Sequence, residues 1–176
     1  MPERFWLRHD LHIVAACALV LAAAWLLRDR TDAVASRPVA LAGVTVTVPA
    51  SWIVDGAAGV ARGEDAITHV DVRVEDPPPP QVGLDAVLEL ERGRRYGDVY
   101  QRTATGNTDA AGKTWLRTTY AYAFKPSPTH TPRVATAVEY AWAGGAHVYV
   151  VTLHGPTEQR VKDLEPVVFH AIQVGQ

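Results

Sequence analysis

Seven histidines are the residues of this chain whose chemistry depends most on spacing, because imidazole nitrogens bind metal ions and exchange protons near neutral pH. His147 and His154 lie in one predicted strand, but seven positions separate them, so they point to opposite faces of the sheet. No two histidines have the i,i+2 spacing of a strand face or the i,i+4 spacing of a helix face. The others are His9, His12, His69, His130 and His170. The sequence predicts no metal site, and only one assembled from distant histidines is left open.

The sequence also lacks the usual motifs of nucleophilic catalysis and of nucleotide binding. Ser51, in PASWIV, is not flanked by the glycines of a hydrolase nucleophile elbow. The glycines of GAAGVARG match neither the dinucleotide-binding spacing nor the P-loop spacing. Glu139 has the most sheltered surroundings of the carboxylates, among alanines, but we expect it on an exposed face of a sheet. We therefore expect no catalytic residue, no cofactor and no enzymatic activity.

Trp115 and Arg117 are the candidate interaction residues. They lie on one face of the predicted strand TWLRTTYAYAF, and Tyr120 and Phe124 lie on the other. The favoured interpretation is a sheet whose two faces are both covered by helices, so that Trp115 is a core residue. The alternative is a face that binds a partner or an apolar ligand, in which case Trp115 and Arg117 form the interaction surface.

Composition excludes some classes of partner. Lysine and arginine total 17 and aspartate and glutamate total 19, so the chain lacks the basic charge of a nucleic-acid-binding protein. The single cysteine lies in the N-terminal apolar run, so the remaining chain has neither an internal disulfide nor a thiolate metal site. About 140 residues follow that run, the usual size of one domain.

The uncharged run over residues 11–27 has the length and the flanks of a membrane span. Its 17 residues extend about 25 Å as a helix, just enough to cross a bilayer. Tryptophans near its ends suit the membrane interface, and arginines can extend their charges to the headgroups. The expected anchor residues are Leu11, Leu27, Trp6, Trp25, Arg8 and Arg28. We expect a tail over 1–10, a transmembrane helix over 11–27, a stalk over 28–38 and one domain over 39–176.

Two other fates of the N-terminal segment are left open. The tripeptide AVA that ends at Ala35 has the form of a signal-peptide cleavage site before Ser36, although the charged RDRTD separates it from the apolar run. Cys17 ends the tetrapeptide VAAC, which resembles a lipobox, but the apolar ALVLAAAWLL follows where a lipoprotein begins its polar mature chain. An uncleaved anchor is the favoured interpretation.

The domain alternates strand and helix patterns. Period-two alternation predicts strands, helical spacing of apolar residues predicts helices, and Gly144-Gly145 between two alternating runs predicts a hairpin. Thr157 is the expected N-cap of the last helix, and Pro166 should interrupt or restart that helix. The expected strands are 44–49, 67–76, 100–105, 114–124, 133–143 and 146–155, with a turn over 106–113, and the expected first helix is 83–98, stopped by Gly97. This order predicts an α+β layered domain.

Taken in order, these residues resemble a known superfamily of α/β/α sandwiches. An early strand running into VTVPASWIV, a central helix, the hairpin end AHVYVVTLHGP and the tail DLEPVVFHAIQV are similar to the PsbP-like superfamily, which includes DcrB-like and LpqN-like bacterial envelope proteins and the Ran-release factor Mog. The resemblance covers about residues 39–174. It implies a single antiparallel sheet between helices, preceded here by one transmembrane helix. It also implies no shared catalytic residues.

The resemblance directs the expectation of function. The superfamily is largely non-enzymatic, its members bind and steady other proteins, and its bacterial members are mostly exported or membrane-attached. We expect a single-pass subunit of the bacterial cytoplasmic membrane whose domain faces the periplasm and contacts a larger integral-membrane protein complex. Charge does not fix this orientation, because arginines flank the apolar run on both sides. The alternatives are an envelope module that binds an apolar small molecule, an exported or lipid-anchored protein, and an enzyme of the nuclear-transport-factor fold.

Overall fold

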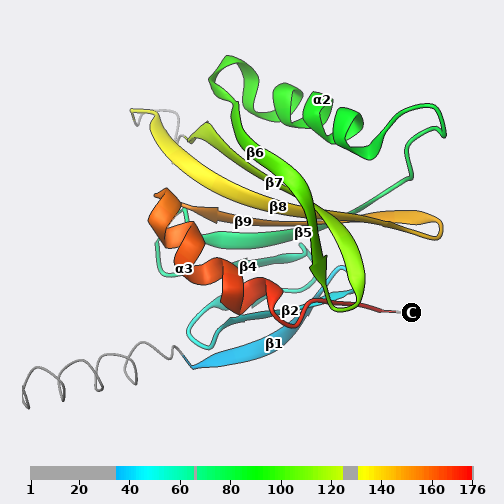
Figure 1. Ribbon diagram of the computed structural model, residues 1–176. Coiled ribbons are helices and arrows are strands. Elements are labelled where there is room, and N and C mark those ends of the chain that lie inside the picture. The colour runs from blue at the N-terminus through cyan, green and yellow to red at the C-terminus, as the bar shows by residue number, and fades with distance from the viewer. Residues whose placement is uncertain (1–34, 66, 125–130, 176) are drawn as a thin grey trace, which may run out of the picture. The chain divides into compact units, whose positions relative to one another are not determined.

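The computed structural model describes residues 35–65, 67–124 and 131–175 (Figure 1). The chain divides into two compact units, 1–35 and 36–176, and the described residues belong almost entirely to the second. The expected tail, membrane helix, Cys17 and all six anchor residues lie outside the described part. Within residues 35–65, 67–124 and 131–175, no helix has the length and apolarity of a membrane span.

The described chain is sheet-rich, with two α-helices. The strands are β1 (Ser36–Leu41), β2 (Val44–Pro49), β3 (Ile53–Asp55), β4 (Val60–Arg62), β5 (His69–Glu75), β6 (Gln101–Ala110), β7 (Lys113–Phe124), β8 (Arg133–Gly144), β9 (His147–Gly155) and β10 (Gln173–Val174). The helices are α2 (Leu84–Tyr96) and α3 (Glu158–Phe169), with a 3₁₀ turn η1 (Gly97–Val99) after α2. The α+β class is confirmed.

The prediction of a single sheet is wrong, because the strands form two. The larger has seven strands in the order β3-β4-β5-β9-β8-β7-β6, and the smaller has three in the order β1-β2-β10. All neighbouring strands are antiparallel. β1 and β2 pair over their whole length in the small sheet, and Gln173 and Val174, which follow α3, return to add a third strand beside β2. A two-residue strand carries no alternation, so the sequence could not show it. β1 begins at Ser36, so residues 36–38 of the expected stalk belong to this sheet.

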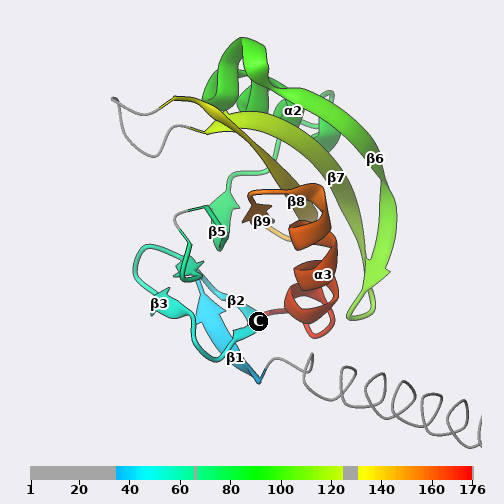
Figure 2. The same ribbon diagram turned by 90° about the vertical axis from the view of Figure 1, so that its left-hand side faces the viewer.

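Both faces of the large sheet are covered, as the favoured interpretation of Trp115 required. Figure 2 shows β6 and β7 curving around α3, with α2 on their outer side. Trp115 is fully buried in the main core, together with α3 residues such as Val161 and Leu164. Leu88 of α2 is buried in a smaller cluster on the opposite face. The alternating side chains of the strands therefore supply two apolar layers.

Local signals set most element ends. The Thr157 hydroxyl accepts a hydrogen bond from the Arg160 backbone N–H at 3.2 Å, so the predicted N-cap is confirmed. The helix predicted to stop at Gly97 ends at Tyr96, and the Gly-Gly hairpin joins β8 to β9. Pro166, by contrast, lies inside α3, which continues to Phe169. The buried residues Leu164, Val168 and Phe169 on either side of it hold the helix against the core despite the lost backbone hydrogen bond.

The expected turn over 106–113 is also wrong. β6 continues to Ala110, and only Ala111 and Gly112 form the turn, both with positive φ (51° and 71°). Residues 106–110 have a weak strand propensity, but each pairs with β7 in register. Pairing with a long neighbouring strand thus overrides the local signal.

Candidate functional site

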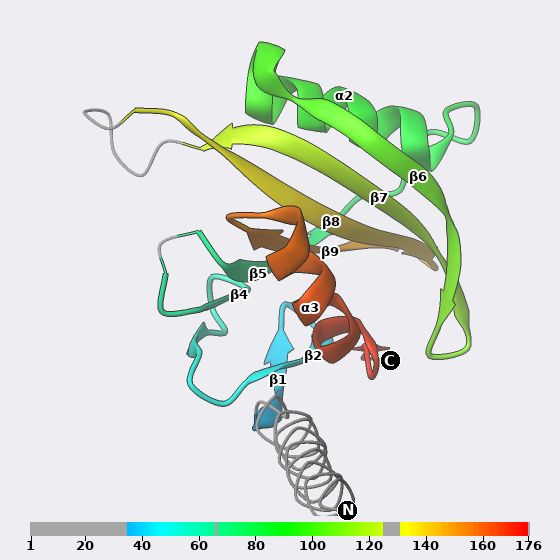
Figure 3. The ribbon, with the colours of Figure 1, turned by 60° about the vertical axis from the view of Figure 1, so that its left-hand side comes forward.

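The concave side of β6 and β7 faces α3 (Figure 3), and residues of these elements line a groove. We call it the β6–α3 groove, and it consists of two hollows. One, of about 270 Å³, is lined by strand residues such as Thr103 and Thr119 and by helix residues such as Lys162. The other, of about 300 Å³, lies between the end of β6 and the last turn of α3 and is lined in part by Asp109 and Phe169. Glu165 lines both hollows. The groove therefore follows the length of α3.

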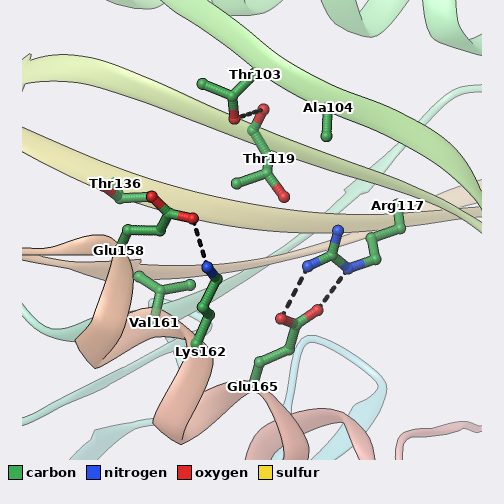
Figure 4. A pocket seen from close by; sticks show the side chains of 9 residues that line it. All are labelled: Thr103, Ala104, Arg117, Thr119, Thr136, Glu158, Val161, Lys162 and Glu165. Atoms are coloured by element: carbon green, nitrogen blue, oxygen red, sulfur yellow. Dashed lines mark hydrogen bonds and ion pairs between the residues drawn. The ribbon is translucent and has the colours of Figure 1, made fainter.

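An ion pair crosses the groove between its two hollows (Figure 4). The Arg117 guanidinium donates to both carboxylate oxygens of Glu165, with Nε–Oε1 at 2.6 Å and NH2–Oε2 at 2.9 Å. The Tyr140 hydroxyl donates to Oε1 at 2.8 Å. Burial alone would raise the pKa of Glu165, but these hydrogen bonds hold it below its ordinary value of 4.5. The Arg117–Glu165 ion pair thus connects β7 to α3 near the middle of the groove.

The walls of the first hollow combine polar and apolar groups. Thr103, Thr119 and Thr136 contribute short hydroxyl-bearing side chains from three strands. On the helix, Lys162 Nζ lies 2.7 Å from Glu158 Oε1, and both side chains are more than half exposed. Short side chains of mixed polarity such as these suit the alternating side chains of an extended peptide.

β6 forms one rim of the groove and is an open edge. It is the last strand of the seven-stranded order, and residues 101–107 are exposed. On its outer side no strand of the described chain pairs with it. The register shifts between Arg102 and Ala104, a β-bulge of the kind found at sheet edges. Such a strand presents backbone N–H and C=O groups that an extended segment can pair with.

The structure separates the two candidate interaction residues. Trp115 is fully buried and its indole N–H donates to the Ala110 carbonyl oxygen at 3.1 Å, so Trp115 presents no surface. Arg117 lies in the groove, on the same face of β7. The difference follows from position, because α3 and the small sheet cover the part of β7 that carries Trp115, whereas Arg117 remains about one-third exposed.

The expectation that Glu139 is exposed is wrong. Its side chain is fully buried beneath α2, where Arg92 Nε and NH2 donate to Oε1 at 3.1 and 2.8 Å. Arg73 NH2 donates to Oε2 at 3.2 Å, and Thr152 Oγ1 lies at 3.4 Å. Arg92 is 47 residues from Glu139 in sequence, so no local pattern could reveal this pair. It joins α2 to the centre of the sheet.

A cluster that the histidine spacing missed lies on the α2 face of β5 and β9. His69 and His154 are cross-strand neighbours, and Asp71 is two residues along β5 from His69. One ligand atom from each of the three lies within 4.8 Å of the others. These residues match the alternative that the sequence left open, a site assembled from distant histidines. The i,i+2 spacing of His69 and Asp71 is visible in the sequence, but His154 joins them only through the register of β5 and β9.

Hydrogen bonds orient every ring nitrogen of this cluster except one. His69 Nδ1 donates to the Ile67 carbonyl oxygen at 2.7 Å, which leaves Nε2 unprotonated in the neutral ring. His154 Nε2 lies 2.8 Å from Asp71 Oδ1, and His154 Nδ1 lies 2.8 Å from the Tyr122 hydroxyl. His69 Nε2 lies 4.0 Å from the same Asp71 oxygen. The two imidazole rings are stacked, with centroids 4.2 Å apart.

Burial and neighbouring charges set the protonation of the cluster. Burial, and then the His154 ring, lower the pKa of His69, so its imidazole is neutral near neutral pH. Burial would raise the pKa of Asp71, but the hydrogen bond from His154 and the charges of His154 and Arg73 hold it below the ordinary value. The cluster therefore contains an ionised carboxylate beside a neutral imidazole.

Comparisons with known proteins bear on the fold. No family model matches the sequence, and no curated protein matches it. Among solved structures the chain is similar to cyanobacterial PsbP (CyanoP) from Synechocystis sp. PCC 6803, with a TM-score of 0.51 and 14% identity over 80% of this chain and 93% of that one. It is also similar to LpqN, involved in cell envelope biogenesis of Mycobacterium tuberculosis (TM-score 0.49, 13% identity, 84% and 94% covered), and to the Saccharomyces cerevisiae Ran-binding protein Mog1p (0.46, 12%, 76% and 83%).

The arrangement of sheets and helices agrees with the first of these structures over nearly its whole length. At 14% identity the likeness concerns the fold and carries no residue roles. The described domain therefore has the PsbP-like fold that the sequence resemblance implied.

Proposed function

We propose that this protein is a non-enzymatic accessory subunit, anchored in the bacterial cytoplasmic membrane by residues 11–27, whose periplasmic domain binds a larger integral-membrane protein complex. The observation that carries the binding role is the open edge of β6 beside the β6–α3 groove. The anchor rests on the length and flanks of the apolar run.

The proposed ligand of the domain is an extended segment of the partner protein. An added strand would pair with the backbone of β6, and its alternate side chains would point into the groove toward α3. The threonine-lined walls and the paired Glu158 and Lys162 suit small or polar side chains at those positions. Main-chain pairing would supply affinity, and the two hollows would supply selectivity between partner sequences.

The superfamily resemblance supports a binding role, since its members largely bind and steady other proteins. The bulge and the exposed Arg102 are features that keep an edge strand such as β6 from pairing with the same strand of a second copy. A second copy of the domain is for this reason a poorer occupant than a dedicated partner segment.

Purification of the full chain from membranes in a mild detergent tests the proposal. The expected result is recovery with integral-membrane proteins in a fixed stoichiometry, because the domain and its anchor both hold the complex together. Recovery of the chain as a monomer under every mild condition would contradict the accessory role.

The anchor has its own test, which is N-terminal analysis of the membrane-fraction protein. An intact N-terminus is the expected result. A chain that begins at Ser36 would instead show a secreted domain, and a blocked chain that begins at Cys17 would show a lipoprotein. Either of the latter results would overturn the single-pass anchor.

A further inference from the structure

The cluster of His69, Asp71 and His154 is not used by the proposed binding role. It lies on the α2 face of the sheet, whereas the β6–α3 groove lies on the opposite face. We propose that these three residues bind one divalent transition-metal ion, for which Zn²⁺ is the reference ion. A bound ion would connect β5 to β9 through Asp71 and His154, which are 83 residues apart in the sequence.

The ligand set is chemically suited to such an ion. Two imidazole nitrogens and one carboxylate oxygen are a common donor set for zinc and for other divalent first-row metals, with positions left open for water or a further ligand. The donor atoms lie within 4.8 Å of one another without any movement of the backbone. β5 and β9 are central, paired strands, so the register that brings these residues together is firmly held.

The hydrogen-bond partners of the two histidine ligands are also typical of a metal site. Histidine ligands usually donate their second ring nitrogen to a carbonyl or another acceptor, which fixes the ring and the tautomer. His69 Nδ1 already donates to the Ile67 carbonyl oxygen, and its Nε2 lies on the side of Asp71. His154 Nδ1 is held by the Tyr122 hydroxyl at 2.8 Å. Tyr122 is therefore a positioning residue for His154.

Metal binding would change the contacts at His154. Its Nε2 now lies 2.8 Å from the Asp71 carboxylate, so that nitrogen carries the proton. Coordination would require the tautomer with the proton on Nδ1, which would donate to the Tyr122 oxygen. The rings would also leave their stack, because two planes only 11° apart do not meet at one ion.

Arg73 is the arginine beside the ligand carboxylate. Arg73 Nε lies 3.6 Å from Asp71 Oδ2, the carboxylate oxygen that faces away from His154. Its guanidinium is already paired with Glu75 and Glu139, at 2.8 and 3.2 Å. The Asp71 oxygen near the imidazoles is thus free of direct competition from arginine. The His69 side chain is one-quarter exposed, which gives an ion a route to the cluster.

Titration of Zn²⁺ into the purified full chain in detergent, measured by isothermal titration calorimetry, tests the site. The expected result is one Zn²⁺ per chain and a rise of the unfolding temperature with free zinc, since an ion that binds the folded state stabilises it. The imidazole NMR signals of the wild-type chain should shift for two histidines. A wild-type chain that takes up no stoichiometric zinc would overturn the proposal.

Variants assign the binding to these residues. Asp71→Asn, which keeps the side-chain shape, and His69→Ala should each weaken zinc binding about tenfold or more, and Tyr122→Phe about tenfold through its effect on His154. The matched control is His147→Ala, an exposed histidine on the opposite face of β9, which should bind like the wild type. The double variant His9→Ala, His12→Ala should also bind like the wild type. Unchanged binding in both Asp71→Asn and His69→Ala would overturn the site.

Discussion

Arg117 shows how a single residue defines the groove. Its guanidinium reaches from β7 to α3 and makes a two-point contact with Glu165, a geometry that fixes the separation of strand and helix. Burial would raise the pKa of Tyr140 on its own, and with the hydrogen bond to Glu165 the pKa reaches about 12. Tyr140 therefore keeps its proton and donates to Glu165 across the physiological range. Three side chains from three elements thus set the shape of the proposed binding surface.

The free energy of unfolding should depend on pH through Glu165. Its folded-state pKa lies below the ordinary value of 4.5, so the carboxylate contributes stability above pH 4.5 and loses it as the pH falls through the lowered pKa. Glu165→Gln should therefore lower the free energy of unfolding by about 1 kcal/mol at neutral pH, and the difference from wild type should shrink toward zero in more acidic buffer. Urea unfolding of both proteins at a series of pH values measures this difference in the free energy of unfolding.

Glu158→Gln is the control for this pH series. Glu158 lies on the same helix and pairs with Lys162, but both side chains are exposed. The hydrogen bond from Lys162 lowers the pKa of Glu158 too, but because the pair is exposed to solvent, Glu158→Gln should change the free energy of unfolding much less than Glu165→Gln at every pH. A difference between Glu165→Gln and wild type that stayed constant across the series would show that the ionised carboxylate is not the source of the stability.

At the scale of elements, the sequence predicted what local patterns encode. The strand Val44–Pro49 matches the prediction at both ends, because alternating valines lie on its buried face. The N-cap Thr157 and the stop at Gly97 were also predictable, since each acts on its own neighbours. Pairings between distant segments were not predictable. The return of β10 to β2 and the continuation of β6 to Ala110 both depend on a partner strand rather than on local propensity.

The contact of α2 with the sheet depends on a buried charge pair. Glu139→Ala would remove the buried carboxylate partner of the Arg92 guanidinium and leave it only the partly exposed Glu89, and loss of a buried partner costs about 3–5 kcal/mol. Chemical denaturation of the full chain in detergent should show that loss. Arg94→Ala, an exposed arginine on the same helix, should change stability by less than about 0.5 kcal/mol.

A double variant tests whether the loss of stability comes from leaving one charge of the pair buried alone. Arg92→Met with Glu139→Leu removes both charges and keeps apolar volume, so it should recover most of the stability that Glu139→Ala loses. If Glu139→Ala were no less stable than Arg94→Ala, the pair would not be what holds α2 in place.

At the scale of the whole molecule, the two faces of the large sheet have different roles. The α2 face carries the buried Arg92–Glu139 pair and the His69–Asp71–His154 cluster, whereas the α3 face carries the groove and the open edge of β6. The sequence predicted Arg117 as a candidate but not the groove itself, because the groove arises from the curvature of β6 and β7 around α3 (Figure 2). The histidine cluster was not predictable either, since it needs the register of β5 and β9.

The most direct test of the proposed function is co-purification of partner proteins with two matched variants of the full chain. Ala104→Arg places a long charged side chain on β6 at the groove, and Ala57→Arg places the same side chain in the exposed turn between β3 and β4, at the other edge of the sheet. We predict that mild-detergent purification recovers stoichiometric integral-membrane partners with wild type and Ala57→Arg but loses them with Ala104→Arg. Equal recovery with both variants, or no partner with the wild type, would contradict partner binding at the β6–α3 groove.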